Sequence, residues 1–381
     1  MRGRADEQTP LFHIFNVEER IRQDHPLRDI RCRTDRILRA LAPQFAEAYS
    51  HTGRPSVPPE RLLKAMLLMA LYSLRSERQL CERIDTDLLF RWFLDMQPSE
   101  EAFDPTTFTH NRQRLDAHDL TRSFFAQVVA EALTAGLCSE HFSVDGTMIE
   151  SHAAAKSFQP KDSDNDVPKD ANGFQPRNAE VDFHGQKRSN DTHQSKTDPE
   201  AKLHRKGPGK EAKLSHMGHV LSENRNGLIV EITATEASGT AERTAALAMI
   251  DELQATHDVQ PKTVGADKGY DSGEFLLDLE TRRIEPHVPL VKAPTEPEKV
   301  VHEQRRAGVA ARHRMKERMA TIGYRLSQKC RKKVEECFGW LKTIAGLDRS
   351  RTVGRWKLKQ ALEMGAAAFN LVRLRKLKPA L

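Results

Sequence analysis

The sequence predicts an α/β protein in which helices cover a mixed sheet, with an all-helical region ahead of it. From residue 139 onward the chain reads in the order strand, hairpin, helix, strand, helix, strand, helix. That order is typical of a mixed sheet covered by helices. The first 138 residues read instead as short helices. We therefore expect a helical domain over residues 1–138 and an α/β domain over residues 139–381.

The N-terminal region consists of short helices joined by tight turns. Prolines suited to a first helical turn precede apolar residues at helical spacing over residues 62–74. Ser76 and Gln79 have the spacing of a capping box, and Asp104 is placed to cap a helix that begins at Pro105. A longer helix over residues 121–135 ends at Gly136. These helices form either a DNA-binding domain or a packed accessory bundle, and the sequence leaves both open.

The α/β region begins with a strand over residues 141–149 that contains Asp145. From 152 to 210 the chain is poor in large apolar residues, which predicts a loosely ordered polar insertion. Two apolar runs then flank residues 224–227, and the Asn-Gly pair there is a strong hairpin signal. The remaining elements are expected as helices over 240–254, 272–282, 328–343 and 358–377 and strands over 262–266 and 287–291.

The distribution of charge points to a polyanionic partner. The chain has 381 residues and a net charge of +6, but residues 301–381 carry 21 Lys and Arg against 6 Asp and Glu. Such an asymmetry indicates that the C-terminal region binds a polyanion. The five cysteines are scattered without a CxxC pair, which excludes a disulfide framework and argues against structural zinc. No secretory signal or membrane-spanning run is visible, so we expect a cytoplasmic protein.

Three acidic residues are candidates for one site. On a strand, Asp145 shares a face with Ser143 and Thr147, and the following Gly146 allows a ligand or backbone to approach closely. Asp267 stands at the carboxyl end of a short apolar strand, where open α/β sheets place ligands. Glu335 lies on a helix with Arg331 four residues before it and Lys342 seven after.

Each of these carboxylates also has a structural explanation. Asp145 suits a turn or a cap, and Glu335 suits a surface salt-bridge ladder. Asp271 is the expected helix cap next to Asp267, and Glu336 competes with Glu335 but points about 100° away. Taken together, three carboxylates suit a divalent-metal site for phosphoryl transfer. No Walker-type loop, GxSxG elbow or zinc constellation competes with that interpretation.

Several stretches in the same order resemble the DDE transposases of bacterial insertion sequences, most closely the insertion-sequence-five-like branch. The matching stretches are SVDGTMIES, HRKGPGKEAKLSHMGHVLSENRNGLIVEITAT, VGADKGYDSGEF and RKKVEECFGWLK, preceded by PSVPPERLLKAMLLMALYSLRSERQLCERI. The resemblance covers roughly residues 45–375. It implies an RNase H-like core with a mixed five-stranded sheet, in which Asp145, Asp267 and Glu335 form the metal-binding triad. Arg331 and Lys342 match the family's pattern around the glutamate, whereas the position of its tyrosine falls on Gln328, with Tyr324 one helical turn upstream.

The resemblance also implies a reaction and its partners. Water hydrolyses a phosphodiester at the terminal inverted repeats of the element, and the freed 3′-hydroxyl then attacks target DNA. The implied cofactor is Mg²⁺, with Mn²⁺ as a substitute, and the partner is double-stranded DNA bound by a dimer in the nucleoid. Arg331 and Lys342 are expected to position phosphates, and basic residues farther along the chain are expected to add salt-dependent affinity for DNA: Arg349, Arg351, Arg355 and Lys357, followed by Lys359, Arg373, Arg375 and Lys376.

Two other functions are compatible with these residues. One is an RNase H-like nuclease that hydrolyses DNA without joining it. The other is a transposon-derived DNA-binding protein without catalytic activity, against which three converging carboxylates argue. His216 and His219, three residues apart on a strand, face opposite sides and are expected to be structural or close to DNA.

Overall fold

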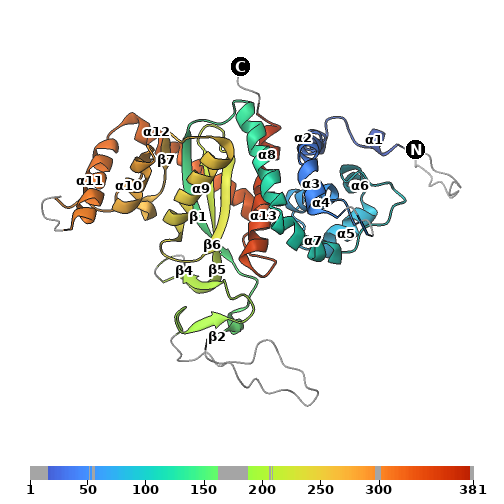
Figure 1. The fold of residues 1–381 in the computed structure, drawn as a ribbon, viewed down its shortest axis with the longest axis horizontal. Helices are drawn as coiled ribbons and strands as arrows, with labels where there is room; N and C mark the ends of the chain where they lie inside the picture. The colour runs from blue at the N-terminus through green and yellow to red at the C-terminus, as the bar shows by residue number, and fades with distance from the viewer. Residues whose placement is uncertain are drawn as a thin grey trace, which may run out of the picture.

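The computed structural model describes residues 16–377, apart from residues 51, 54–55, 162–187, 206, 208 and 297–301. A mixed sheet stands at the centre, with the helices of the N-terminal region on one side and a pair of helices from the C-terminal half on the other (Figure 1). The termini of the described chain lie far apart, at the outer edge of the N-terminal helices and above the sheet (Figure 1). The predicted class, α/β with a preceding helical region, is confirmed.

The N-terminal region is entirely helical. Its elements are α1 (Val17–Arg20), α2 (Pro26–Ala40), α3 (Ala42–Ala48), α4 (Pro59–Leu71), α5 (Glu77–Thr86), α6 (Leu88–Phe93), α7 (Thr106–Ala117) and α8 (Leu120–Thr134). The Ser76 side chain caps α5 by accepting from the Gln79 N–H at 3.1 Å, as the spacing predicts. The predicted start at Pro105 is one residue early, because Pro105 is the N-cap of α7.

The sheet has the predicted mixed character. Its main strands run in the spatial order β6, β5, β1, β7, β8: β6 (Ile229–Glu236), β5 (Ala212–Glu223), β1 (His141–Glu150), β7 (Thr263–Gly265) and β8 (Glu285–His287). The pairs β1–β5 and β5–β6 are antiparallel, and the pairs β1–β7 and β7–β8 are parallel. The predicted hairpin joins β5 to β6, and Gly227 in it has a φ of 66°. A sixth strand, β4 (Lys202–Arg205), pairs with the start of β5 and was not predicted.

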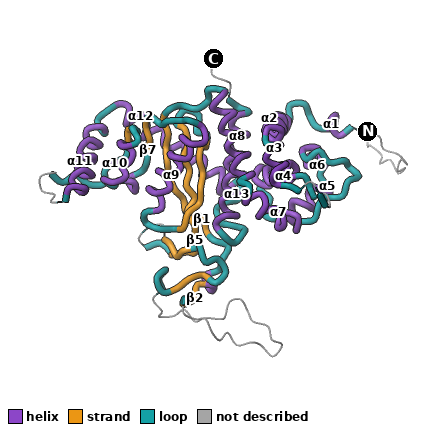
Figure 2. The backbone as a smooth tube through the Cα atoms, viewed as in Figure 1, coloured by secondary structure: helices purple, strands orange, loops and turns teal. Residues whose placement is uncertain are grey.

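The structure corrects three expectations about individual elements. The strand predicted over 287–291 is instead β8 over Glu285–His287, because its pairing with the three-residue strand β7 ends at Gly265 and His287. The basic stretch ahead of the last two helices contains α11 (Glu303–Arg318), and α12 (Ile322–Thr343) begins six residues earlier than predicted. The polar insertion is ordered at both ends, where β2 (Phe158–Pro160) pairs with β3 (His193–Ser195) below the sheet (Figure 2). Residues 162–187 lie outside the described residues.

Helices cover both faces of the sheet. On β1, Gly146 adjoins α9 (Ala241–His257) while Asp145 bonds a side chain of α12, and consecutive strand residues point to opposite faces. The helix α13 (Arg355–Leu374) packs against β6 and against α4 and α8 of the N-terminal region (Figure 2). The helices α10 (Gly273–Thr281) and α11 pack closely together. A Cβ added to Gly273 would lie only 2.7 Å from the Gly308 carbonyl oxygen.

Polar contacts join the N-terminal helices to the sheet and to α13. The Arg122 guanidinium on α8 donates to both oxygens of Glu231 on β6, at 2.6 and 2.7 Å. Thr121 donates to Glu363 on α13 at 2.6 Å. One hydrophobic core runs through all of these elements. The two expected domains therefore share a core, and the domain boundary at residue 138 stays a prediction. Within the described residues, no helix is long and apolar enough to cross a membrane.

Candidate active site

Asp145 lies in the middle of β1, opposite Val220 of β5, rather than at a turn or a helix cap. Its side chain is 20% exposed. Oδ1 accepts from the Gly146 N–H at 2.8 Å, and Oδ2 lies 3.4 Å from Nη1 of Arg331. Burial raises the pKa of Asp145 to about 6, and the charges of Asp267 and Glu335 add to that increase against the opposing effect of Arg331. A half-buried carboxyl with a raised pKa is a common feature of functional sites.

Asp267 reaches the same region from the neighbouring strand. In the parallel pair of β1 and β7, Ser143 stands opposite Gly265. Asp145 lies two residues after Ser143, and Asp267 lies two residues after Gly265, so the register brings the two aspartates to the same level of the sheet. Asp267 caps the short 3₁₀ helix η2 (Lys268–Tyr270), with Oδ1 accepting from the Gly269 N–H at 2.8 Å.

Asp271 is structural, but not in the predicted way. The N-cap of α10 is Ser272. Both Asp271 oxygens instead accept from Arg312 of α11 at 2.9 Å, and Oδ2 also accepts from the Val291 N–H at 2.8 Å. A bidentate arginine contact of this kind fixes both partners. Asp271 therefore ties α11 to the segment after β8, and capping of α10 by Asp271 is a wrong prediction.

Glu335 approaches from α12. Its side chain is 66% exposed, and Oε1 lies 3.9 Å from Nη2 of Arg331. One guanidinium therefore stands between the carboxylates of Glu335 and Asp145. The neighbouring Glu336 is directed elsewhere and pairs with Arg373 of α13 at 3.3 Å. The helix thus presents Glu335, and not Glu336, to the two aspartates.

The donor set suits a hard divalent cation, because all three candidate ligands are carboxylates. Two buried polar atoms in the same region, the Tyr270 hydroxyl and Nε of Arg331, have no hydrogen-bond partner. Orphaned groups beside converging carboxylates fit a site that holds a hydrated ion. The carboxylates do not form a closed shell, and in the described part of the chain no three His, Cys, Asp or Glu side chains are arranged to hold a metal ion.

Sequence reasoning missed two residues that lie at this site. Glu242, in the first turn of α9, places Oε1 2.8 Å from where a Cβ on Gly146 would stand. Tyr270 is fully buried, and the charges of Glu242, Asp145 and Asp267 act on its phenol. The glycines that follow Asp145 and Asp267 were a signal that another group approaches there. The identity of that group depends on how α9 packs against the sheet.

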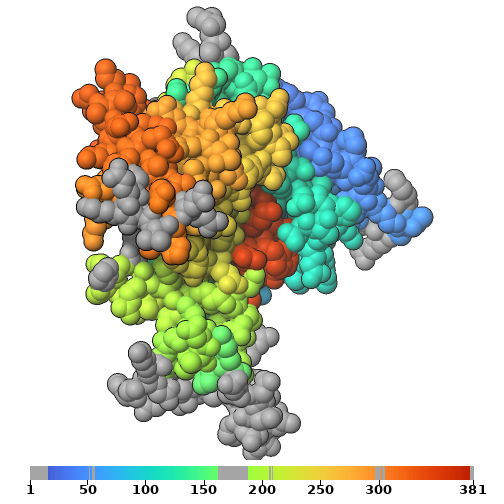
Figure 3. All heavy atoms as spheres, turned by 60° about the vertical axis from the view of Figure 1, so that its left-hand side comes forward, coloured from blue at the N-terminus to red at the C-terminus, as the bar shows by residue number. Residues whose placement is uncertain are grey.

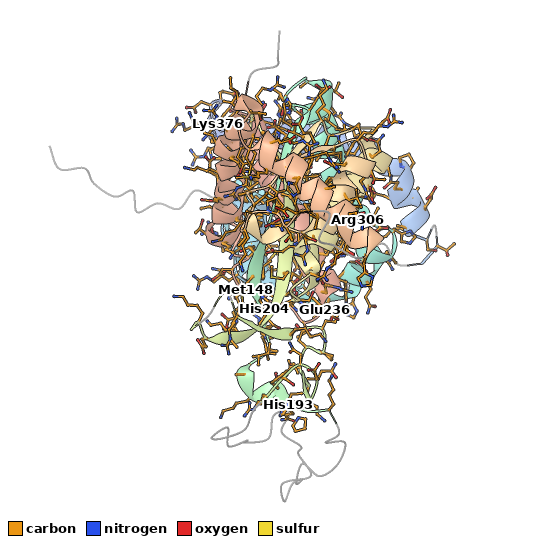
Figure 4. The ribbon with its side chains drawn as sticks, turned by 90° about the vertical axis from the view of Figure 1, so that its left-hand side faces the viewer. Met148, His193, His204, Glu236, Arg306 and Lys376 are labelled. Atoms are coloured by element: carbon orange, nitrogen blue, oxygen red, sulfur yellow. The ribbon has the colours of Figure 1, made fainter. Side chains whose placement is uncertain are left out.

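The two residues expected to position phosphates and the tyrosine position have distinct surroundings. Arg331 is described above, and Lys342 donates from Nζ to the carbonyl oxygen of Met148 on β1 at 3.0 Å. Met148 lies on the part of the sheet that leads toward the pair of strands carrying His193 (Figure 4). Gln328 donates to the carbonyl oxygens of Ala266 and His287 at 3.2 and 2.6 Å, so it holds the ends of β7 and β8 together.

Tyr324 does not lie at the carboxylates. Its ring stands edge-on to the His287 imidazole, with centroids 5.9 Å apart. Tyr270 is the tyrosine on which the charges of Asp145, Asp267 and Glu242 act. The two strand histidines are buried: His216 bonds Asp198 at 2.9 Å and His219 bonds Thr235 at 2.7 Å, which makes both structural.

Four of the remaining basic candidates, Arg349, Arg351, Arg355 and Lys357, lie around the loop between α12 and α13. Arg349 lies 3.9 Å from Glu150, and Arg355 lies 3.3 Å from Glu200. Arg351 and Lys357 line a cavity of about 780 Å³ between α4 and α5 of the N-terminal region and the start of α13. Residues of this last part of the chain reach the surface between the sheet and the N-terminal helices (Figure 3, red).

Comparison with known proteins identifies two matching families. The family described as "Transposase domain (DUF772)" matches residues 15–114. The family described as "Transposase DDE domain" matches residues 137–371, more than half of the chain. No curated protein sequence matches.

Similar solved structures include two transposases. A piggyBac transposase synaptic complex with hairpin DNA has a TM-score of 0.39 and 9% identity, covering 93% of this chain and 77% of that one. A Mos1 transposase paired-end complex with left transposon end has a TM-score of 0.21 and 13% identity, covering 78% and 81%. The match over residues 137–371 shows that the chain belongs to the DDE transposase family, whose members cleave and join DNA with the help of divalent metal ions.

Proposed function

We propose that Asp145, Asp267 and Glu335 are the metal-binding catalytic carboxylates of this transposase, with Mg²⁺ as the physiological ion and Mn²⁺ as a substitute. The observation that carries the proposal is the register of β1 and β7, which brings the two aspartates to one level beside Arg331. Arg331 also reaches toward Glu335 from one helical turn away. A divalent ion bound there supplies Lewis acidity for phosphodiester cleavage.

The proposed reaction has two steps at the same site. Water attacks the phosphodiester at the end of the element's terminal inverted repeat, and the bond to the 3′-oxygen breaks, leaving a 3′-hydroxyl. That hydroxyl then attacks a phosphodiester of target DNA. A new phosphorus–oxygen bond forms and the target's own 3′-oxygen leaves, so no external energy source is required.

Two cations of α12 support this chemistry. Arg331 is 18% exposed and lies against Asp145, close enough to neutralise charge that develops on a bound phosphate. Lys342 is half-buried and held over β1 by its bond to the Met148 carbonyl oxygen. We assign to both residues the positioning of the DNA backbone.

DNA binding extends from the site toward the N-terminal helices. The cavity lined by Arg351 and Lys357 also includes Arg75 at the start of α5, so cations from both parts of the chain meet there. We propose that DNA next to the cleaved bond follows this cavity, that the N-terminal region contributes to its binding, and that two copies of the chain act on two transposon ends in the nucleoid.

The test uses three carboxylate variants on a duplex that carries the element's terminal inverted repeat. Asp145→Asn, Asp267→Asn and Glu335→Gln should each lower single-turnover cleavage and strand transfer at least about 1,000-fold. Glu336→Gln is the matched control, because it removes the same charge from the next position of α12. The control should retain the activity of the native protein.

Other outcomes identify the rival functions. Cleavage that survives all three substitutions would place the catalytic site elsewhere. Hydrolysis without any joined product, with Mg²⁺ or Mn²⁺ and with precleaved 3′-hydroxyl ends, would make the protein a nuclease. DNA binding without cleavage of any substrate would make it a transposon-derived binding protein.

A further inference from the structure

Glu242 reaches the candidate site from the face of the sheet opposite to α12. It lies in the first turn of α9 and is half-buried. A Cβ added to Gly146 would lie 2.8 Å from Oε1, 3.0 Å from Cγ and 3.2 Å from Cδ of Glu242. The Glu242 side chain therefore fills the space that a side chain at Gly146 would occupy. Its carboxylate packs against the backbone of the residue next to Asp145.

The same carboxylate also adjoins Asp267. A Cβ added to Gly269 would lie 3.0 Å from Oδ1 of Asp267 and 3.6 Å from Oε2 of Glu242. Both carboxylates are thus within van der Waals reach of a single point. The charges of Asp267 and Asp145 both act on Glu242, although burial is the largest cause of its raised pKa. Glu242 is therefore close to Gly146, which follows Asp145, and to Gly269, which lies two residues after Asp267.

The charges of this region are not balanced. Four carboxylates lie in this region. Arg331 contacts Asp145 and Glu335, and the charge of Arg243 acts on Glu242. Among the described residues Glu242 has no hydrogen bond and no ion pair. A half-buried carboxylate beside two others is costly to keep ionised unless a cation is bound. This arrangement favours the binding of a cation close to Glu242.

Tyr270 supplies a second observation that does not depend on the carboxylates' own positions. Its side chain has 0% exposure and its hydroxyl has no hydrogen-bond partner. Buried hydroxyls are nearly always bonded, so an orphaned one indicates a group that is present when the site is filled. Burial and then the charges of Glu242, Asp145 and Asp267 raise the pKa of Tyr270 well above its usual value. Its hydroxyl therefore stays protonated and is available to donate.

We propose that Glu242 is a fourth carboxylate ligand of the divalent-metal site, and that the Tyr270 hydroxyl positions it by donating a hydrogen bond. This inference rests on the proposed function, in which Asp145 and Asp267 bind the ion. Glu242 adds a ligand from α9, so the site draws on both faces of the sheet. The role of Gly146 and Gly269 is to leave room for this carboxylate.

A purely structural role for Glu242 makes different predictions. An acidic residue in the first turn of a helix is stabilised by the helix dipole, so its removal lowers stability whether or not metal is present. A metal ligand behaves in the opposite way. Its removal relieves repulsion in the metal-free protein and raises the Tm, while the stabilisation gained from added metal becomes smaller.

The experiment measures Mn²⁺ binding by calorimetry and Tm with and without Mn²⁺, using the full chain. Glu242→Gln should weaken Mn²⁺ binding about 100-fold. Tyr270→Phe, which removes only the hydroxyl, should weaken it about 10-fold. Glu252→Gln is the control, because Glu252 lies on the same helix but contacts Arg122 and Thr256 instead. The control should bind Mn²⁺ as the native protein does.

The outcomes separate this inference from the proposed function. If Asp145→Asn and Asp267→Asn lose Mn²⁺ binding while Glu242→Gln binds normally and has a lower Tm, Glu242 is a helix-dipole residue and the inference is overturned. If the two aspartate variants also bind Mn²⁺ normally, the proposed metal site itself is wrong. A loss of binding in all three variants, with a raised metal-free Tm for Glu242→Gln, supports both proposals.

Discussion

Arg331 of α12 contacts Asp145 of β1, with Nη1 of the arginine 3.4 Å from Oδ2 of the aspartate. The two residues are far apart in the sequence, one in the middle of β1 and the other on α12. Nη2 of the same guanidinium lies 3.9 Å from Oε1 of Glu335. In the absence of metal, Arg331 is thus the positive charge between two of the proposed ligands.

Substitution of Arg331 should lower the rate of DNA cleavage more than substitution of a neighbouring residue on α12 does. Arg331→Ala should lower single-turnover DNA cleavage about 100-fold, because a charge-assisted contact to phosphate is lost. Arg331→Lys, which keeps the positive charge but not the planar guanidinium, should lower DNA cleavage by a smaller factor than Arg331→Ala does. Lys332→Ala removes an exposed charge from the adjacent position and serves as the control. Activity of Arg331→Ala within twofold of the native protein would exclude a role for Arg331 in phosphate binding.

The stability of the metal-free protein should depend on pH through Asp145. Its pKa in the folded protein, about 6, is above the ordinary value of 3.8. The folded state therefore binds this proton more tightly, and the stability that the proton contributes is present below about pH 4 and is lost as the pH rises through 6. Asp145→Asn should stabilise the protein by about 3 kcal/mol at pH 7.5 and by about half of that at pH 5.

Denaturant titrations in the presence of EDTA measure this difference. Asp251→Asn is the control, because Asp251 lies on the surface of α9 and pairs with Arg282. The same stabilisation of Asp145→Asn at both pH values would show that the carboxyl is not held protonated by burial.

The contact between Arg122 and Glu231 should make a large contribution to stability. Glu231 is 3% exposed, and burial raises its pKa to about 7 although Arg122 opposes that increase. Arg122→Ala leaves this carboxyl buried without a cation and should cost about 3–5 kcal/mol of unfolding free energy. Replacing both residues by Met should recover most of that loss.

The second acidic partner of Arg122 provides the control for this prediction. Glu252 is 53% exposed and lies 3.1 Å from Arg122. Glu252→Gln should change the unfolding free energy by less than about 1 kcal/mol. Chemical denaturation compares these three variants with the native protein, and an Arg122→Ala variant as stable as Glu252→Gln would contradict the prediction.

The cavity between the N-terminal helices and α13 should contribute to DNA affinity. Replacing Arg351 and Lys357 by Ala should weaken binding to duplex DNA and reduce the slope of log affinity against log salt by about 2. Arg36 and Arg39 are exposed on α2, and their double replacement removes the same charge elsewhere. Fluorescence anisotropy over a range of salt concentrations compares the two. Equal slopes for both double variants would show that the cavity is not on the DNA path.

Local sequence patterns predicted much of the architecture. Asn-Gly marked the hairpin between β5 and β6, and Ser76 marked the start of α5, because turns and caps depend on residues that are adjacent in the chain. The helix α11 was missed because its sequence is strongly basic and has little amphipathic pattern. Only Ala311 and Met315 of its described side chains are fully buried, in contact with elements far away in the sequence.

Asp271 and Gln328 show that a local sequence pattern does not identify the hydrogen-bond partners of a side chain. The spacing around Asp271 suits a helix cap, but the residue bonds Arg312, which is 41 positions away. Gln328 stands where a tyrosine was expected, and its amide instead joins the ends of two strands. Both roles depend on how α11 and α12 lie against the sheet.

The sequence by itself determined the family, the order of the strands and helices, and the identity of three candidate carboxylates, since each is marked by its immediate neighbours. Only the tertiary structure decided which other groups join them. Glu242 and Tyr270 become part of the site because α9 crosses the sheet at Gly146 and because η2 turns the Tyr270 ring into the core. Contacts between elements that are distant in the chain arise from packing, and no local pattern encodes them.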